Sequence, residues 1–156
     1  MLFLVFAFRP DNKGIYIEIH DNQYGCYQSR EYYLQDSVLT IDDYDEEGAI
    51  HDSKYKNKDL LNRKLSEAEI RKEINFMASF PLDSLKADYN SGRDGCDSIR
   101  QMAITIRYNG ITKVIGIQDC YSEKVARIFR FINSLLSKNK NDLKISYLRK
   151  AFKCSK

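Results

Sequence analysis

The sequence predicts a single α+β domain, residues 1–156, in which an antiparallel sheet of five to six strands carries two helices packed on one face, in two layers. Two apolar runs flank Asn109 and Gly110, the dipeptide most typical of a tight β-hairpin turn. Ser122 then precedes a strongly amphipathic segment, as at the start of a helix. Residues 15–20 alternate isoleucine with polar side chains, the period of a half-buried strand. A chain of 156 residues is long enough to bury a sizeable core.

Three strands are expected before the first helix, at residues 15–20, 26–34 and 38–41. The connections between them are too short for crossovers, so the strands should form an antiparallel meander. Residues 42–62 are polar, charged and aperiodic, and we expect a surface loop there. A short last strand is predicted from a second alternation, at Leu143, Ile145 and Tyr147.

Both helices have recognisable start signals. Ser66 and Glu69 form a capping box, in which each side chain binds a free backbone amide of the first turn. Pro81 ends this helix at or before Phe80, because the residue before a proline avoids helical geometry. Ser122 caps the second helix, whose apolar residues fall on one face: Val125, Ile128, Phe129, Ile132, Leu135 and Leu136.

The hairpin has a register that its own sequence specifies. Counting outward from Asn109 and Gly110 matches apolar residues across the two strands, as in the pairs Met102–Ile117 and Ile104–Ile115. A slip of one residue would move all of them to the other face. Arg107 and Thr105 fall on the opposite face, which we expect to be wetter.

The first eight residues, Met-Leu-Phe-Leu-Val-Phe-Ala-Phe, form a continuous apolar run that admits two interpretations. The run suits a buried first strand. It also suits the apolar part of a truncated secretory signal within residues 1–13, although a positive start and a small-residue cleavage site are missing. It is too short to span a bilayer, and we expect no membrane span elsewhere. Export, to the periplasm or the medium, and a cytoplasmic location therefore both stay open.

The chain has four cysteines, which are Cys26, Cys96, Cys120 and Cys154. No two of them are closely spaced, and only two histidines accompany them, so a zinc site is not expected. The hairpin register places Cys120 opposite Ile99, three residues beyond Cys96, and a small bend after Gly95 would bring the two sulfurs within bonding range. A Cys96–Cys120 disulfide is therefore the candidate bridge, with two reduced thiols as the alternative in a reducing compartment.

Charge is unevenly distributed along the chain. The net charge of +3 is too small to indicate a nucleic-acid partner, and we expect none. Residues 36–59 hold eight acidic residues and three lysines, whereas the basic C-terminal segment, 138–156, holds seven basic residues and one acidic. These segments are interpreted either as two solvated surfaces that attract each other or as a tail that binds an acidic partner.

The acidic segment partly matches a calcium loop. Asp43, Asp45, Glu47 and Gly48 occupy the first, third, fifth and sixth positions of such a loop, but the twelfth position, which should be glutamate, is Lys54. The preceding residues also resemble a strand rather than a helix. We therefore expect no metal and no other cofactor, and no phosphate-binding, dinucleotide-binding or nucleophile motif is present.

Six tyrosines concentrate in the first third of the chain, in or beside the expected meander: Tyr16, Tyr24, Tyr27, Tyr32, Tyr33 and Tyr44. The last four of these are the candidate binding residues. Tyrosine is a preferred anchor of protein interfaces because it buries a large area with little loss of entropy. Packing in the core or across strands is the competing role. The best candidate binding surface in the sequence combines these tyrosines with the acidic residues Asp43, Asp45 and Glu47.

The sequence favours a small non-catalytic protein-binding domain. An inhibitor or immunity-type partner of a bacterial toxin or enzyme is its concrete form, because no catalytic set of residues stands out and no catalytic residue is assigned. One alternative is an exported structural or ligand-binding module that contains disulfides. Another is a divalent-metal-dependent enzyme that uses Asp43 and Asp45. The sequence does not specify the partner or the oligomeric state.

Overall fold

The described chain contains seven strands: β1 (Tyr16–Gln23), β2 (Gln28–Gln35), β3 (Val38–Asp45), β4 (Lys58–Lys64), β5 (Asp88–Asn90), β6 (Arg100–Tyr108) and β7 (Ile111–Gln118). The helices are α1 (Glu67–Ser79), α2 (Glu123–Ser134) and two short 3-10 helices, η2 (Leu82–Ser84) and η4 (Lys138–Leu143). The structure is a computed structural model that describes residues 14–23, 28–45, 58–90, 100–118 and 120–145. Residues 1–13, for which the sequence leaves two interpretations, lie outside these ranges.

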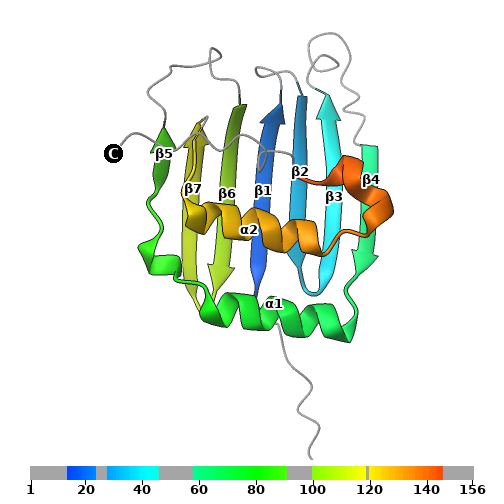
Figure 1. Cartoon of the computed structure of the whole chain (residues 1–156), viewed down its shortest axis with the longest axis horizontal. Coiled ribbons are helices and arrows are strands. Elements are labelled where there is room, and N and C mark those ends of the chain that lie inside the picture. Colours follow the sequence, from blue (N-terminus) through cyan, green and yellow to red (C-terminus); the bar gives the residue numbers. More distant parts are fainter. Residues whose placement is uncertain (1–13, 24–27, 46–57, 91–99, 119, 146–156) are drawn as a thin grey trace, which may run out of the picture.

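These seven strands form one sheet in the order β4-β3-β2-β1-β6-β7-β5 (Figure 1). Neighbouring strands are antiparallel except β5 and β7, which run parallel. Both α-helices lie over the same face of the sheet. The predicted α+β class is confirmed, but the expected five to six strands are too few.

Two strands were missed in the sequence because they lack a clear period of two. β4 lies at the edge of the sheet and contributes two neighbouring leucines to the core, Leu60 and Leu61, so its sequence KDLLNRK does not alternate. The pairing of β3 with β4 also shifts register between Ile41 and Asp42. β5 has only three residues. The expected loop over residues 42–62 is thus wrong at both ends, and residues 46–57 lie outside the described chain.

The predicted hairpin and its register are confirmed. β6 and β7 pair Met102 with Ile117 and Ile104 with Ile115. The turn residues Asn109 and Gly110 have φ values of 49° and 76°. These left-handed values suit asparagine and glycine, and they match the twist of the two strands.

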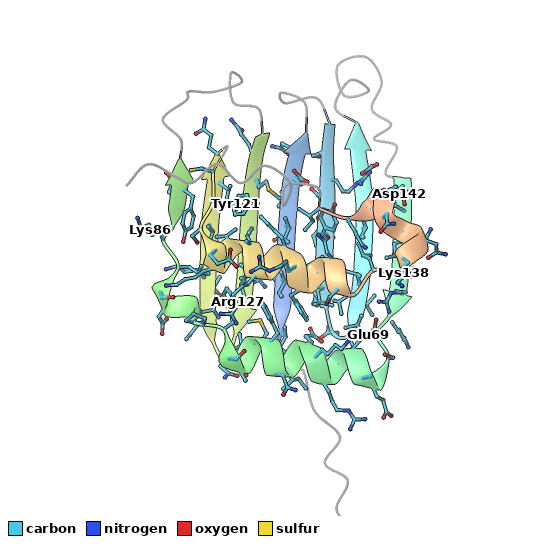
Figure 2. The ribbon with its side chains drawn as sticks, viewed as in Figure 1. Glu69, Lys86, Tyr121, Arg127, Lys138 and Asp142 are labelled. Carbon is cyan, nitrogen blue, oxygen red and sulfur yellow. The ribbon has the colours of Figure 1, made fainter. Side chains whose placement is uncertain are left out.

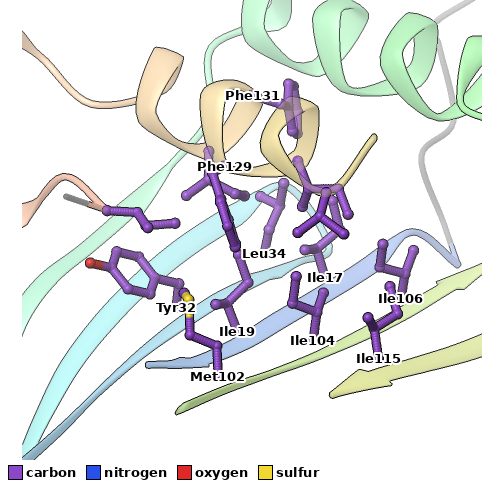
Figure 3. Close-up of a cluster of buried hydrophobic side chains, with 14 of the residues drawn as sticks. Ile17, Ile19, Tyr32, Leu34, Met102, Ile104, Ile106, Ile115, Phe129 and Phe131 are labelled. Atoms are coloured by element: carbon purple, nitrogen blue, oxygen red, sulfur yellow. The ribbon is translucent and has the colours of Figure 1, made fainter. Parts of the chain in front are cut away.

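A ladder of isoleucines crosses the middle of the sheet on the side of the helices (Figure 3). Ile17 and Ile19 of β1 pair with Ile106 and Ile104 of β6, and Ile104 pairs in turn with Ile115 of β7. Each of these side chains is at most 1% exposed. Such cross-strand pairs of β-branched residues, covered by a helix, form the centre of the core.

The apolar stripe of α2 covers this ladder, as its helical spacing predicts. All six predicted positions are buried: Val125, Ile128, Phe129, Ile132, Leu135 and Leu136. Ser122 caps the helix by accepting a hydrogen bond from the amide of Val125. Beside α2, the ring of Phe76 in α1 stacks on the ring of Phe131, with 4.3 Å between centroids. The two helices therefore share an aromatic contact and form one layer on the sheet.

Polar contacts hold the chain after α2 against the sheet. The hydroxyl of Tyr32 in β2 donates to the carbonyl of Leu143, at 3.0 Å. The guanidinium of Arg30 donates to a backbone carbonyl of η4, at 2.8 Å. The side chain of Asn133 accepts from the amide of Ile145 at 2.8 Å and donates to its carbonyl at 3.1 Å.

The short strand predicted near the C-terminus is wrong over the residues that can be compared. Leu143 ends η4, and Ile145 lies outside any strand, although both side chains are buried as an alternating pattern requires. A strand partner would need the carbonyl of Leu143 and the amide of Ile145. These groups are already hydrogen-bonded to the side chains of Tyr32 and Asn133. Tyr147 lies outside the described residues.

The first turn of α1, where Figure 2 labels Glu69, has the predicted capping box. Ser66 accepts from the amide of Glu69, and the carboxylate of Glu69 accepts from the amide of Ser66 at 2.8 Å. Arg63 of β4 donates to the same carboxylate at 2.7 and 3.0 Å. These hydrogen bonds, chiefly the one from Arg63, lower the pKa of Glu69 from 4.5 to about 2.

We expect Glu69→Gln to lower the free energy of unfolding by about 1 to 2 kcal/mol at pH 7. Because the folded pKa lies below the ordinary value, the ionised carboxylate stabilises the fold fully above pH 4.5, and this contribution is lost as the pH falls toward 2. Urea unfolding between pH 7 and 3 measures the difference, which should shrink on acidification. Glu67→Gln is the control, because that side chain is 84% exposed. An equal loss in the control, or a difference independent of pH, would contradict the assignment.

Candidate functional site

Alternation along the strands sends every second side chain to the face of the sheet opposite α1 and α2 (Figure 1). We call this side the open face. The register places on it Tyr16, Glu18, His20 and Asn22 of β1, Ser29, Glu31 and Tyr33 of β2, Thr40 and Asp42 of β3, Gln101, Ala103, Thr105 and Arg107 of β6, and Thr112, Val114 and Gly116 of β7.

His20 joins two carboxylates at the centre of the open face. Its Nε2 lies 2.9 Å from Glu18 Oε1 on the same strand, and its Nδ1 lies 2.7 Å from Glu31 Oε1 on β2. Both nitrogens can donate at once only when the ring is an imidazolium. The side chains are partly buried, with exposed fractions of 37% for His20, 19% for Glu18 and 12% for Glu31. The two carboxylates are therefore held in place rather than free to move in solvent.

Two tyrosines extend this arrangement on either side. The hydroxyl of Tyr33 donates to Glu31, and its ring meets the ring of His20 edge-on, with 6.3 Å between centroids. The guanidinium of Arg107 lies over the ring of Tyr16, 4.5 Å from its centroid. Partial burial raises the pKa of Tyr16, and a hydrogen bond to Glu18 raises it further.

These six side chains form a continuous chain of contacts across β6, β1 and β2, which we call the central network: Arg107, Tyr16, Glu18, His20, Glu31 and Tyr33. Tyrosine and arginine are the residues most often found at the energetic centres of protein interfaces. The contacts within the central network fix the geometry of its six side chains before any partner binds, which reduces the entropy lost on binding. The arrangement can therefore present an ordered set of charges and rings to another molecule.

Small residues lie on the open face beside the central network, over β6 and β7. Ala103 lies opposite Gly116, and both are small. The carboxylate of Asp88 lies above Gly116, where one of its oxygens is 3.3 Å from the position that a Cβ would take. Val114 is 59% exposed beside them.

The sequence-predicted site residues are distributed over several environments. Tyr33 belongs to the central network. Tyr32 points to the other side of the sheet and is 1% exposed, so its ring lies in the core. Tyr44 and Asp45 end β3, but their side chains lie outside the described part of the chain. The structure does not describe any part of Tyr27, Glu47 or Cys96.

Asp43 lies on the helix side of the sheet in a well-formed ion pair. Its two oxygens accept from Arg30 at 2.6 and 3.0 Å. This hydrogen bonding raises the pKa of Arg30. Because the guanidinium occupies both oxygens, Asp43 is poorly placed to bind a metal ion. Within the described ranges, no three residues of the types that bind metals are grouped for such a site.

Cys120, just beyond β7, is fully buried and disulfide-bonded. The other three cysteines, Cys26, Cys96 and Cys154, lie in segments that the structure does not describe. The Cys96–Cys120 pairing therefore stays a prediction. No helix in the described part of the chain is long and apolar enough to cross a membrane.

Most of the central network was not singled out in the sequence. Glu18 and His20 occupy polar positions of the first alternating strand, and Arg107 lies on the face of the hairpin expected to be wetter. The signal was thus present within each strand. The pairing of β1 with β6 could not be predicted from these local patterns, because the two strands are far apart along the chain.

We compared the chain with protein-family models, with curated proteins and with solved structures, and none of the three comparisons found a match. The function must therefore be inferred from the chain's own residues and their arrangement.

We expect Glu18→Gln to lower the pKa of Tyr16 toward 10.0, its ordinary value, because the variant removes a negative charge and replaces a carboxylate acceptor with a weaker, neutral amide oxygen. Carbon NMR of ring-labelled tyrosine measures the titration, with Tyr16→Phe to assign the signal. Glu67→Gln on α1 should leave it unchanged. A pKa of Tyr16 that does not respond to Glu18→Gln would contradict the contact between the two side chains.

Proposed function

We propose that this chain is a non-catalytic protein-binding domain, of the inhibitor or immunity type, and that its open face contacts the partner. The central network carries this proposal. Six polar and aromatic side chains from three strands are ordered by one another on the face of the sheet that α1 and α2 leave uncovered.

The open face offers a partner both signs of charge. Within the central network Glu18 and Glu31 flank the ring of His20, and Arg107 lies over the ring of Tyr16. Asp42 lies opposite Glu31 but is only 8% exposed, so it adds little to the charge that a partner meets. Charged side chains that are held in position fix the register of a partner with complementary charges and disfavour partners with the wrong charge pattern. An enzyme whose active-site cleft carries such a complementary charge pattern is the kind of target that this face could block.

We expect open-face variants to weaken partner binding strongly. The wild-type chain is used to capture a stoichiometric partner from its native source, the partner is then produced in pure form, and Kd is measured by calorimetry. Tyr33→Ala and Glu18→Lys should raise Kd by about thirtyfold or more, as expected for a central interface residue worth about 2 kcal/mol. If the partner is an enzyme, one equivalent of wild-type chain should inhibit it.

Arg71→Ala supplies the matched control, because Arg71 is 63% exposed on α1 and lies away from the open face. Unfolding curves of each variant confirm that it remains folded. The proposal fails if no stoichiometric partner is recovered. It also fails if the open-face variants bind as well as the wild type while Arg71→Ala does not.

A second candidate is an exported module held together by disulfides, and Cys120 is the observation that favours it. A fully buried, disulfide-bonded cysteine indicates an oxidising compartment. We assign Cys96 as its partner, because the confirmed hairpin register places Cys120 two residues beyond Gln118, which pairs with Gln101. Export is compatible with protein binding, so this candidate concerns where the domain acts and what stabilises it.

We expect peptide mapping of the native protein under non-reducing conditions to recover a peptide pair that joins Cys96 and Cys120. Cys96→Ser should then lower the free energy of unfolding by about 2 to 4 kcal/mol, because it releases a closed loop in the unfolded chain. Cys154→Ser serves as the comparison. Four free thiols in the denatured protein would contradict the bridge, and a bridge from Cys120 to Cys26 or Cys154 would contradict the assignment of Cys96.

A further inference from the structure

The outer edge of β7 is paired over only part of its length. β5 lies beside β7 at three positions, Gly116, Ile117 and Gln118 (Figure 1). Within the described chain no strand pairs with the outer edge of residues 111–115. The same five residues pair fully with β6 on their inner side. They therefore form a strand that is ordered by one neighbour and open to a second.

The direction of the backbone groups follows from a contact at the end of this segment. The amide of Gly116 donates to the carbonyl of Ala87, on the outer side, at 2.8 Å. Backbone groups alternate in direction along an antiparallel strand, so those of Val114 and Thr112 point outward as well. Two amides and two carbonyls are thus arranged as in the edge of an incomplete ladder.

The side chains of this segment also differ from those of an ordinary protected edge. Ile111 and Val114 are 44% and 59% exposed, and they are the two exposed large apolar residues in the part of the chain that the structure describes. The other edge strand, β4, has four charged residues among its seven. Charged residues are the usual means of preventing an edge from pairing with another strand. On the open segment of β7 the single charge is Lys113.

We infer that residues 111–115 bind an extended segment of a partner protein as an added antiparallel strand, and that this segment carries an acidic residue opposite Lys113. The backbone hydrogen bonds of Thr112 and Val114 would supply most of the contact. Val114 favours a β-branched residue opposite it. Arg107, on the other face of the sheet, pairs with Thr112 and adds to the preference for an acidic segment. This inference does not require the open face to bind anything.

A second copy of this chain is a poorer occupant. The two-fold arrangement that satisfies the outer groups of both Thr112 and Val114 places Lys113 directly opposite the other copy's lysine. Like charges in that position destabilise a strand pair. Moving the axis to Val114 would bring the partner strand against β5, because Gly116 is already bonded to Ala87. Lys113 thus disfavours self-pairing and favours an acidic partner.

The test uses the full chain and a blocked synthetic peptide, Thr-Val-Glu-Thr-Val, whose central glutamate would lie opposite Lys113. Titration followed by amide NMR should give saturable shifts centred on Thr112 and Val114. A peptide with lysine in place of glutamate should bind about two- to fivefold more weakly, and Lys113→Glu should reverse this order. Val114→Pro removes an outward amide and should abolish binding. Methylation of the second and fourth amide nitrogens of the peptide should do the same, without any change in the protein.

The controls separate the other occupants of the edge. Arg71→Ala should bind the peptide as the wild type does. Absence of saturable shifts at Thr112 and Val114 overturns the inference, and so does binding that the methylated peptide retains. A dimer in sedimentation experiments that the peptide dissociates would assign the edge to a second copy. Binding that occurs only after removal of residues 1–13 would assign it to the chain's own N-terminal segment. None of these results affects the open-face proposal, which the partner-binding experiment tests separately.

Discussion

Packing of α2 on the isoleucine ladder determines which side chains lie on the open face. Ile17 and Ile19 are buried under the helix, and because a strand alternates with a period of two, Tyr16, Glu18 and His20 must point the other way. The same logic on β2 buries Tyr32 and exposes Tyr33. A slip of one residue in β1 would bury a glutamate and a histidine under α2 and expose two isoleucines. The hydrophobic core and the central network are therefore two results of a single register.

The C-terminal part of the described chain depends on polar contacts as much as on apolar ones. Arg30, held in its place by Asp43, reaches the carbonyl of Asp142, and Tyr32 reaches that of Leu143. These residues come from β2 and β3, at the far side of the sheet from the hairpin. Tyr32 illustrates why a tyrosine in a sequence is ambiguous: its ring fills the core, while its hydroxyl finds a partner there that a phenylalanine could not use.

Much of the architecture could be predicted from local signals. The turn at Asn109 and Gly110, the caps at Ser66 and Ser122, and the apolar stripe of α2 are each specified by residues near one another in sequence. β4 and β5 were missed because an edge strand and a three-residue strand need no strong alternation. The alternation of Leu143 and Ile145 predicted a strand. Both side chains are buried, but the backbone there is the end of η4 and the residues that follow it.

The candidate site was harder to predict for a physical reason. Tyr33 could be singled out because tyrosine is common in interfaces, but the ring of His20 that it meets belongs to another strand, β1. Which residues meet across a sheet depends on strand order, and strand order depends on the packing of the whole chain. The cluster around Asp43 shows the opposite case: an acidic motif conspicuous in sequence contains a residue that serves as the counter-ion of Arg30.

Because β1 lies between β2 and β6, the central network forms only when strands far apart along the chain have paired. β2 follows β1 directly, whereas β6 comes only after the first five strands and α1, so the β1–β6 pairing closes a long stretch of chain. Pairings that close long stretches form slowly, because chain entropy is lost before their contacts compensate for it. Arg107 and Tyr16 meet across this junction. An incompletely assembled molecule would lack that contact, so an intact central network is a direct report of complete assembly.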